Sequence, residues 1–550
     1  MSKLIYYGEE ARSKIVCGAK KLSKAVSVTM GPHGRNVLIG KFVGAPTITK
    51  DGVSVAREVV LLDTAEELGC RIIKEVAGRT ADVAGDGTTT ATVLAEAILS
   101  GGMDELTDGI NPIHFRDGVN EAFKMIKRYI DDISIDITTY DQVKGIATIS
   151  SNNDVVLGET IATAFEMVGR TGIVTAEAHA SSENRIKYTD GIELRAGYST
   201  PALLKSGESQ VTLENAKILI CDRDITHVQD FVSILERCHK ENRPLLILAK
   251  SIRQEALELI TLNRAQGRLN AITVEIPVMG KNNSEWLNDL SNLVGTKVFS
   301  ENMGNPLSSA SFDNLGFAKK ISITRNSTTI IGGNKDDRAI SSRLDFYKEA
   351  LNNFMPDMDR KDLKDRVAFL NNKAALIGVS YSTEAELREK GDRVEDAICA
   401  TKAAIESGIL PGGGITLLRA ASKIDIASLS EKHQRGARVL VNACKRPFYQ
   451  ILLNGYRSVE EISEIEGKIL SNEDLWYGYN LFEEQFGNMM DMGVIDPKKV
   501  TVTALENAIS ITLLLLNTEA ILSEDLITPS GWQPPAGWRP PAQNNLNHSY

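Results

Sequence analysis

Aromatic residues are scarce in this chain of 550 residues, where Phe, Trp and Tyr together make up 6%. Basic residues are also in deficit: 62 Lys and Arg stand against 72 Asp and Glu, which gives a formal net charge of −10. Nucleic-acid-binding proteins usually combine a basic surface with aromatic stacking platforms. We therefore expect no nucleic acid among the partners of this protein.

Cysteine motifs and long apolar runs are missing as well. The six cysteines include no pair with the CxxC spacing of redox and metal sites, which favours reduced thiols in a reducing compartment. No apolar stretch approaches the ~20 residues that span a bilayer, and the first ten residues lack the apolar core of a signal peptide. We expect a cytoplasmic protein without a membrane partner.

The length exceeds what one hydrophobic core normally supports, so two to four domains are expected. Apolar residues recur with helical spacing from 11 to 130 and again from 384 to 522. Between 191 and 376, short apolar segments at 218–221, 244–249 and 271–274 alternate with helical patterns. Alternating strands and helices predict an α/β domain. The fold class is therefore multidomain, with a mostly helical part and an α/β part.

The segment Gly85–Thr90, Gly-Asp-Gly-Thr-Thr-Thr, carries the strongest chemical signal. Its glycines permit positive φ and close approach of the backbone to a ligand, Asp86 offers a ligand for Mg²⁺, and the threonines begin a predicted helix, whose N-terminus favours anions. The missing lysine distinguishes the segment from the Walker motif. An ordinary Asp/Gly turn followed by a threonine helix cap is the alternative, and this segment alone leaves it open.

Three further motifs accompany this segment: Thr-Met-Gly-Pro-His-Gly-Arg-Asn at 29–36, Thr-Ile-Thr-Lys-Asp-Gly at 47–52 and Leu-Pro-Gly-Gly-Gly at 410–414. Together the four motifs resemble the group I chaperonins, the GroEL-type ATP-driven folding machines, over nearly the whole chain. The resemblance implies a chaperonin fold. It places an equatorial ATP-binding domain at 1–132 and 408–526, an intermediate domain at 133–190 and 375–407, an apical domain at 191–374 and a flexible tail at 527–550.

The resemblance also implies ATP hydrolysis with Mg²⁺ and K⁺ as cofactors. Asp86 is the expected Mg²⁺ ligand, and Asp51 and Asp396 are the expected catalytic carboxylates. Asp396 belongs to the intermediate domain, so closure of that domain would complete the site. The other nucleotide-binding residues implied by the family are Thr29, Met30, Gly31, Pro32, Lys50, Gly85, Gly87, Thr88, Thr89, Thr90, Gly413, Asn480 and Asp496.

The expected partners are non-native client proteins, further copies of the chain in a heptameric ring, and a co-chaperonin. Val228, Phe231, Val232 and Leu235 form one apolar stripe on a predicted helix, which by itself is typical of core packing. The family resemblance instead implies a client-binding surface there. Its residues in this chain are Tyr198, Leu203, Val232, Leu235, Leu257, Thr261 and Leu262.

Several positions depart from the family pattern. Leu481 and Phe482 stand where two alanines are usual beside the adenine, which keeps a second interpretation open: a ring-forming, client-binding scaffold with altered or lost ATPase activity. Asp104 and Asp108 add negative charge where rings of the family meet back to back, which predicts a weakened contact between rings. Tolerated changes of the surface are the alternative. The tail carries a Trp/Pro repeat in place of the usual Gly/Met-rich end.

Overall fold

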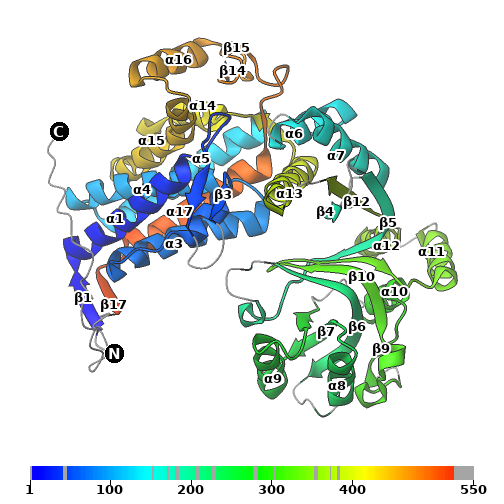
Figure 1. Cartoon of the computed structure of the whole chain (residues 1–550). Helices are drawn as coiled ribbons and strands as arrows, with labels where there is room; N and C mark the ends of the chain where they lie inside the picture. Colours follow the sequence, from blue (N-terminus) through cyan, green and yellow to red (C-terminus); the bar gives the residue numbers. More distant parts are fainter. Residues whose placement is uncertain are drawn as a thin grey trace.

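Figure 1 shows the computed structural model of the chain. The residues that it describes are 3–40, 46–151, 154–169, 172–179, 185–204, 208, 210–225, 229, 231–276, 283–301, 304–351, 357–371, 373–380 and 384–524. The predicted tail at 527–550 and Val228 of the predicted stripe lie outside these residues.

Both ends of the chain build one helical body. Strand β1 pairs antiparallel with β17, so that Tyr7 faces Ala520, and α1, α3, α4, α5, α15 and α17 share one hydrophobic core. The elements of the helical body are β1 (Lys3–Tyr7), α1 (Gly8–Ser27), β2 (Val37–Ile39), β3 (Thr47–Thr49), α2 (Gly52–Glu58), α3 (Thr64–Ala84), α4 (Thr88–Thr107), α5 (Pro112–Ile133), β13 (Ile409–Pro411), α14 (Ile415–Lys423), α15 (Glu431–Asn454), α16 (Val459–Ser471), β14 (Tyr477–Asn480), β15 (Gln485–Asn488), β16 (Ile495–Pro497), α17 (Lys498–Leu516) and β17 (Ala520–Glu524).

One helix of the described chain, α17, reaches the length and apolar composition of a membrane span, which the sequence prediction had excluded. Its most apolar 18-residue window has a mean hydropathy of 1.5, and 61% of that window is buried inside the protein. The helix packs against α3 and α4 in the core of the helical body. Its apolar composition is therefore explained by core packing.

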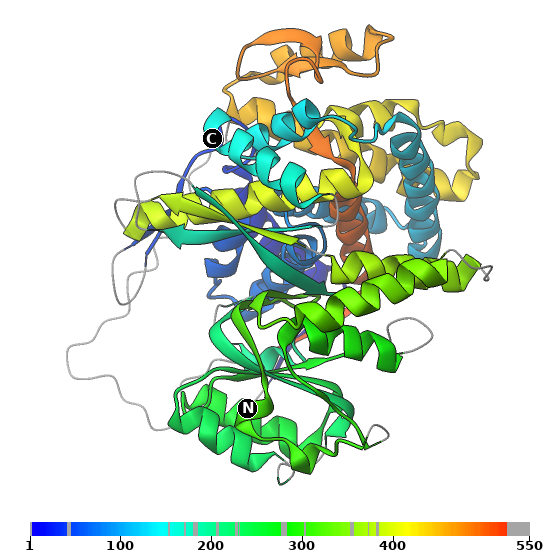
Figure 2. The same ribbon diagram turned by 90° about the vertical axis from the view of Figure 1, so that its right-hand side faces the viewer.

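A connecting layer follows, in which α6, α7 and α13 pack on one end of a large sheet. Figure 2 shows α13 crossing between the helical body above and the rest of the sheet below. Strand β12 lies between β4, its parallel neighbour, and β5, its antiparallel neighbour. The bounds are α6 (Tyr140–Ser150), α7 (Val155–Val168), β4 (Ile173–His179), β5 (Arg185–Leu194), β12 (Lys373–Ser380) and α13 (Glu384–Ser407).

The remainder forms a distal α/β body, as the alternating pattern predicts. The nine-stranded sheet continues from β5 in the order β11-β10-β6-β7-β8, with β9 beside β6, and β6, β7 and β8 are parallel. The elements are β6 (Val211–Ile225), α8 (Val232–Lys240), β7 (Leu245–Ile252), α9 (Gln254–Ala265), β8 (Ala271–Glu275), α10 (Asn283–Val294), β9 (Val298–Phe299), β10 (Gly316–Ile323), β11 (Thr328–Gly333), α11 (Asp337–Leu351) and α12 (Asp357–Leu370).

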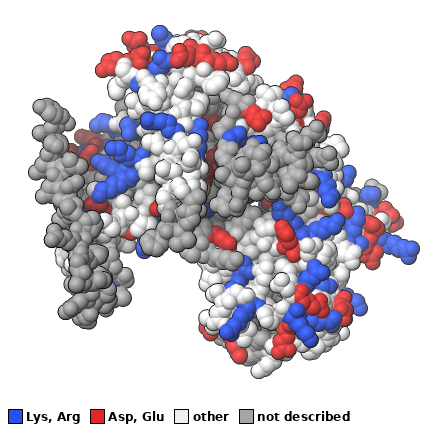
Figure 3. Space-filling model, viewed as in Figure 1, with Lys and Arg blue, Asp and Glu red and all other residues white. Residues whose placement is uncertain are grey.

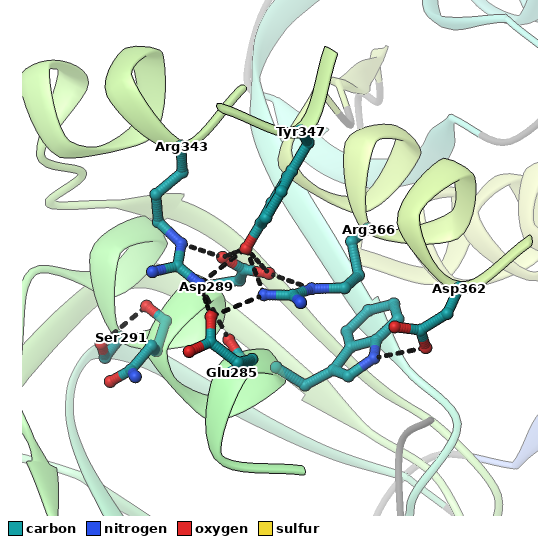
Figure 4. Close-up of polar contacts among 9 residues, drawn as sticks. Glu285, Asp289, Ser291, Arg343, Tyr347, Asp362 and Arg366 are labelled. Atoms are coloured by element: carbon teal, nitrogen blue, oxygen red, sulfur yellow. Dashed lines mark hydrogen bonds and ion pairs between the residues drawn. The ribbon is translucent and has the colours of Figure 1, made fainter. Parts of the chain in front are cut away.

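A buried polar cluster attaches α11 and α12 to α10 (Figure 4). Asp289 is completely buried, and its carboxylate accepts hydrogen bonds from Arg343, from Arg366 at 2.8 Å and from the Tyr347 hydroxyl at 3.0 Å. Two guanidinium groups on one carboxylate would leave excess positive charge, which Glu285 offsets by pairing with both arginines. Every charge in the cluster thus has a counter-charge, as a buried ionic network requires.

Candidate nucleotide site

The predicted phosphate loop is a tight turn between two helices. Helix α3 ends at Ala84, Gly85 and Gly87 adopt φ of +74° and +83°, and α4 begins at Thr88. A Cβ on Gly87 would lie 2.6 Å from the Val500 side chain, so this position needs glycine for space as well as for φ. The N-cap of α4 is Gly87, which has no side chain. The alternative of a threonine cap is therefore wrong.

The threonines of this turn face the segments that the other motifs predict. Thr89 Oγ1 lies 3.4 Å from Thr29 Oγ1 and only 2.2 Å from where a Cβ on Gly52 would stand. The N–H groups of the first turn of a helix have no acceptor within the helix. The Thr29 and Thr89 hydroxyls and the amide donors at the start of α4 therefore gather near the end of α1, and the combination suits a phosphate group.

An asparagine that sequence reasoning missed holds the loop after α1. Asn454 Nδ2, at the end of α15, donates to the carbonyl oxygens of Ser27 at 2.8 Å and Met30 at 2.9 Å. The side chain is 4% exposed. Gly31 follows with φ of +81°, and Ile451, one turn earlier on α15, lies 3.0 Å from the position of a Cβ there. No motif surrounds Asn454 in the sequence, so only the fold reveals its role.

Three of the predicted carboxylates lie near one another. Asp51 caps α2 by accepting from the N–H groups of Val53 at 3.1 Å and Ser54 at 2.8 Å. Burial raises the pKa of Asp86, and the charge of Asp51 raises it further. The hydrogen bond that the Asp86 carboxylate accepts from the Gly87 N–H lowers this pKa in part. Burial and then the charge of Asp86 raise the pKa of Asp496 to about 7. This concentration of negative charge favours a bound cation.

The donor set fits magnesium rather than a cation enclosed by protein ligands alone. Across the described part of the chain, no group of three or more His, Cys, Asp or Glu side chains is arranged to hold a metal ion. Mg²⁺ is commonly held by one or two carboxylates together with substrate phosphates and water. Asp86, beside the turn that is predicted to bind phosphate, matches that pattern. The K⁺ that the family resemblance implies stays a prediction.

Helix α13 brings the connecting layer against this loop. A Cβ on Gly85 would lie 2.4 Å from Cβ and 2.9 Å from Sγ of Cys399, so the loop and the helix touch. One turn further along α13, Ala403 clusters with Ala84 and Val500. Asp396 lies one turn before Cys399 on the same helix. Burial raises the pKa of the Cys399 thiol to about 12, and the charges of Glu395, Asp396 and Asp86 contribute to the rise. The predicted catalytic carboxylate thus belongs to the helix face that meets the phosphate loop.

The predicted motif at 410–414 leads from β13 into α14. Gly413 and Gly414 have φ of +68° and +75°, and β13 pairs with β16 so that Leu410 faces Asp496. The Asn480 side chain stabilises the turn after β14, because its Oδ1 accepts a hydrogen bond from the N–H of Phe482 at 3.0 Å.

The two residues that depart from the family alanines have different surroundings. Leu481 is 5% exposed and lies in the core against Gly455, whereas Phe482 is 62% exposed. The Leu481 side chain fills the core that β14, α14 and α15 share. The effect of Leu481 and Phe482 on the bound base stays a prediction.

The predicted client-binding residues divide into buried and accessible sets. Leu203 and Leu235 are 1% and 5% exposed, so the structure corrects the expectation that they form a surface: they pack into the distal core, as Phe231 does. Val232 and Leu262 are 40% and 61% exposed. Partly exposed positions complete the set: Tyr198, Leu257 and Thr261.

The extra carboxylates predicted to weaken ring contacts are partly compensated within the chain. Arg435 Nη2 lies 3.2 Å from Asp108, and the same guanidinium also pairs with Glu105. Figure 3 shows that acidic side chains nevertheless gather over α16 and the β14–β15 hairpin, at the end of the helical body far from the distal body. The exposed acidic residues of α16, the β14–β15 hairpin and the segment between them are Glu460, Glu461, Glu464, Glu473, Asp474, Glu483 and Glu484.

Comparisons with known proteins bear on the family and the fold of the chain. A family model described as the TCP-1/cpn60 chaperonin family matches residues 22–525. Two crystal forms of the chaperonin gp146 from the bacteriophage EL 2 (Pseudomonas aeruginosa), both in the presence of ATP-BeFx, are 24% identical to the chain and cover 95% of it and 99% of their own length. Their TM-scores are 0.68 and 0.61, so the likeness is one of fold.

Proposed function

Because the chain belongs to the TCP-1/cpn60 chaperonin family, we propose that it is an ATP-dependent chaperonin. It binds non-native proteins, encloses them in the cavity of a ring and refolds them, driven by ATP binding and hydrolysis. The observation that carries this proposal is the convergence of Asp51, Asp86 and Asp496 at the start of α4, with α13 in contact with the loop at Gly85.

Each part of the site has a proposed role. Thr88, Thr89 and Thr90 hold phosphate oxygens, and Asp86 is the ligand of Mg²⁺, which neutralises phosphate charge when bound. Asp51 and Asp396 orient the attacking water and accept its proton. Three groups lie toward the ribose and base: Gly413, Asn480 and Asp496.

The proposed domains follow the chain order. The equatorial domain comprises 1–132 and 408–526, the intermediate domain 133–190 and 375–407, and the apical domain 191–374. Support comes from the separate hydrophobic cores of the helical body, the connecting layer and the distal body. Movement of α13 with the intermediate domain would change the distance between Asp396 and the phosphate loop.

We propose that seven copies form a ring in the cytoplasm and that a co-chaperonin caps the cavity. Clients bind at Tyr198, Val232, Leu257, Thr261 and Leu262. Burying apolar area is non-directional, so an exposed apolar surface binds unfolded chains without sequence preference. At about 25 cal/mol per Å², a few hundred Å² per subunit contributes several kcal/mol.

A binding scaffold without ATPase activity is the second candidate. Its support was the pair Leu481 and Phe482, of which only Phe482 is exposed. The carboxylates Asp51, Asp86 and Asp396 are all present, and a scaffold would not require them. The ATPase therefore remains the better-supported function.

Phosphate release by the purified chain tests the proposal, with Asp396→Asn and Asp86→Asn as variants. Asp396→Asn should retain ATP binding and lose about 10²–10³-fold in kcat, the size of effect expected for a group that acts on the transition state. Asp86→Asn should lose Mg²⁺-dependent binding. A wild-type chain that binds ATP without hydrolysing it would establish the scaffold instead.

A further inference from the structure

A cavity of about 300 Å³ lies where the connecting layer meets the distal body, and none of the residues that line it belongs to the nucleotide site. Its walls come from both parts of the molecule. Lys187 of β5 and Leu376 of β12 line one side, and Phe317, Lys319 and Lys320 of β10 line the other. Figure 1 shows β4, β5 and β12 next to β10 at this junction. We call this space the lysine cavity.

The large sheet curls around this junction. Lys320 Nζ of β10 donates a hydrogen bond to the carbonyl oxygen of Ala176 in β4 at 3.0 Å, although three strands lie between β4 and β10 in the sheet. Ile173 of β4 also clusters with Ile331 of β11 and Leu376 of β12. Ile331 and Leu376 are 2% and 9% exposed, so they give the lysine cavity an apolar wall.

The charges that line the cavity are unequal, because three lysines accompany a single acidic residue, Glu214. Glu214 lies directly opposite Lys320 in the antiparallel pair of β6 and β10, so it offsets the charge of that lysine. Within the described part of the chain, no acidic side chain forms an ion pair with Lys187 or Lys319. These two ammonium groups therefore attract an anion, and hydrogen bonds from a cation to an anion are about twice as strong as neutral ones.

The neighbouring strands hold further donors beside the two lysines. A Cβ on Gly332 of β11, where φ is +67°, would lie 2.9 Å from Cδ and 3.0 Å from Cγ of Lys319, so the lysine stem lies across the space that a larger residue would fill. The Thr189 hydroxyl group of β5 and the Asn215 amide group of β6 are the neutral donors of the lining. Two charged and two neutral donors suit the several oxygens of a phosphate group, and the apolar wall suits a carbon group attached to it.

We propose that the lysine cavity binds a small phosphate monoester whose organic part is apolar. The phosphate accepts hydrogen bonds from Lys187 and Lys319, and the organic part contacts Ile331 and Leu376. A volume of about 300 Å³ is at the lower end of the range for small-molecule sites, which fits a ligand of this size. The inference goes beyond the proposed function, because the cavity is separate from the ATP site.

A molecule bound in the cavity has a mechanical consequence. Lys187 and Leu376 belong to the proposed intermediate domain, whereas Lys319 and Ile331 belong to the proposed apical domain. One ligand that contacts all four side chains restrains the movement of one domain relative to the other. Its occupancy should therefore slow hydrogen exchange in β5 and β10 together.

Saturation-transfer NMR tests the site, with phenyl phosphate as the probe. The assembled protein is first saturated with ADP and Mg²⁺, so that the probe does not report on the nucleotide site. Benzyl alcohol lacks the anion and inorganic phosphate lacks the apolar group, and each should bind about tenfold more weakly than phenyl phosphate. Lys187→Gln and Lys319→Gln should each weaken the binding of phenyl phosphate about tenfold, because each removes one charge-assisted hydrogen bond.

Lys297→Gln is the matched control, since Lys297 is an exposed lysine of the distal body outside the cavity. It should leave the affinity for phenyl phosphate unchanged. Lys319→Arg keeps the charge and should bind the probe more tightly than Lys319→Gln does. The inference is overturned if both glutamine variants at the cavity bind the probe as Lys297→Gln does, if inorganic phosphate or benzyl alcohol binds as tightly as the ester, or if the probe slows exchange in only one of β5 and β10.

Discussion

Gly85 and Cys399 are in direct contact, although 314 positions separate them in the sequence. The contact joins the turn that precedes the Thr88–Thr90 segment to the helix that carries Asp396. Gly85 has φ of +74°, and the Cys399 side chain occupies the space where any larger residue would place its Cβ. Helix α13 can thus approach the phosphate loop this closely only because Gly85 has no side chain.

Replacement of Gly85 by alanine should be costly. The left-handed conformation alone costs a non-glycine residue about 1–2 kcal/mol, and the new Cβ would also displace Cys399. We expect a lower midpoint of urea unfolding and reduced ATPase activity. Gly78→Ala is the control, because Gly78 lies inside α3 with nothing within 4 Å of the added Cβ. That change should raise stability by about 0.5–1 kcal/mol. Equal effects of the two substitutions would contradict the steric argument.

The local parts of the site could be predicted from the sequence. A Gly-Asp-Gly turn followed by threonines specifies a helix start, because its backbone requirements lie within six residues. Asn454 and Cys399 could not be predicted, since each meets its partner only after distant segments fold together. The stripe containing Leu235 predicted a helix correctly, but periodicity does not tell which of two faces meets the core.

The same limit applies to the distal body. The strands and helices followed from alternating apolar segments, whereas the cluster around Asp289 did not. Its arginines come from α11 and α12, and charged residues in a polar helix normally predict a solvated face. Only the packing of α11 and α12 against α10 shows that Arg366 is buried.

Asp496 should make stability depend on pH. Its pKa in the folded chain is raised from 3.8 to about 7, so the folded state holds this proton more tightly than the unfolded state does. Stability should therefore fall as pH rises from about 4 to about 7 and level off above that range. Asp496→Asn lacks this titration. The unfolding midpoint of the variant, measured relative to that of the wild type, should therefore rise as pH increases across the same range. The measurement uses nucleotide-free protein with EDTA. Parallel curves would mean that the carboxyl group titrates normally.

Substitution of Asp289 should weaken the packing of α11 and α12 against α10. Asp289→Ala leaves Arg343 and Arg366 without their shared buried acceptor, and breaking a buried ionic network costs about 3–5 kcal/mol. Hydrogen exchange across α11 and α12 should accelerate, while exchange in the helical body stays unchanged. Glu301→Ala removes an exposed ion pair with Arg223 in the same body and should change stability by less than about 1 kcal/mol. Unchanged exchange in Asp289→Ala would show that apolar contacts suffice.

Substitution of Leu262 should affect client binding, whereas substitution of Leu235 should affect stability. Leu262 is 61% exposed, so Leu262→Ser should leave the unfolding midpoint within about 0.5 kcal/mol of the wild type. It should weaken suppression of aggregation when a chemically denatured protein is diluted into the chaperonin, because apolar surface is lost. Leu235 is 5% exposed, and Leu235→Ala should cost about 2–5 kcal/mol through the cavity that it leaves. If Leu262→Ser suppresses aggregation as well as the wild type, this face of α9 does not bind clients, and the accessible part of the proposed surface would have to lie elsewhere on the distal body.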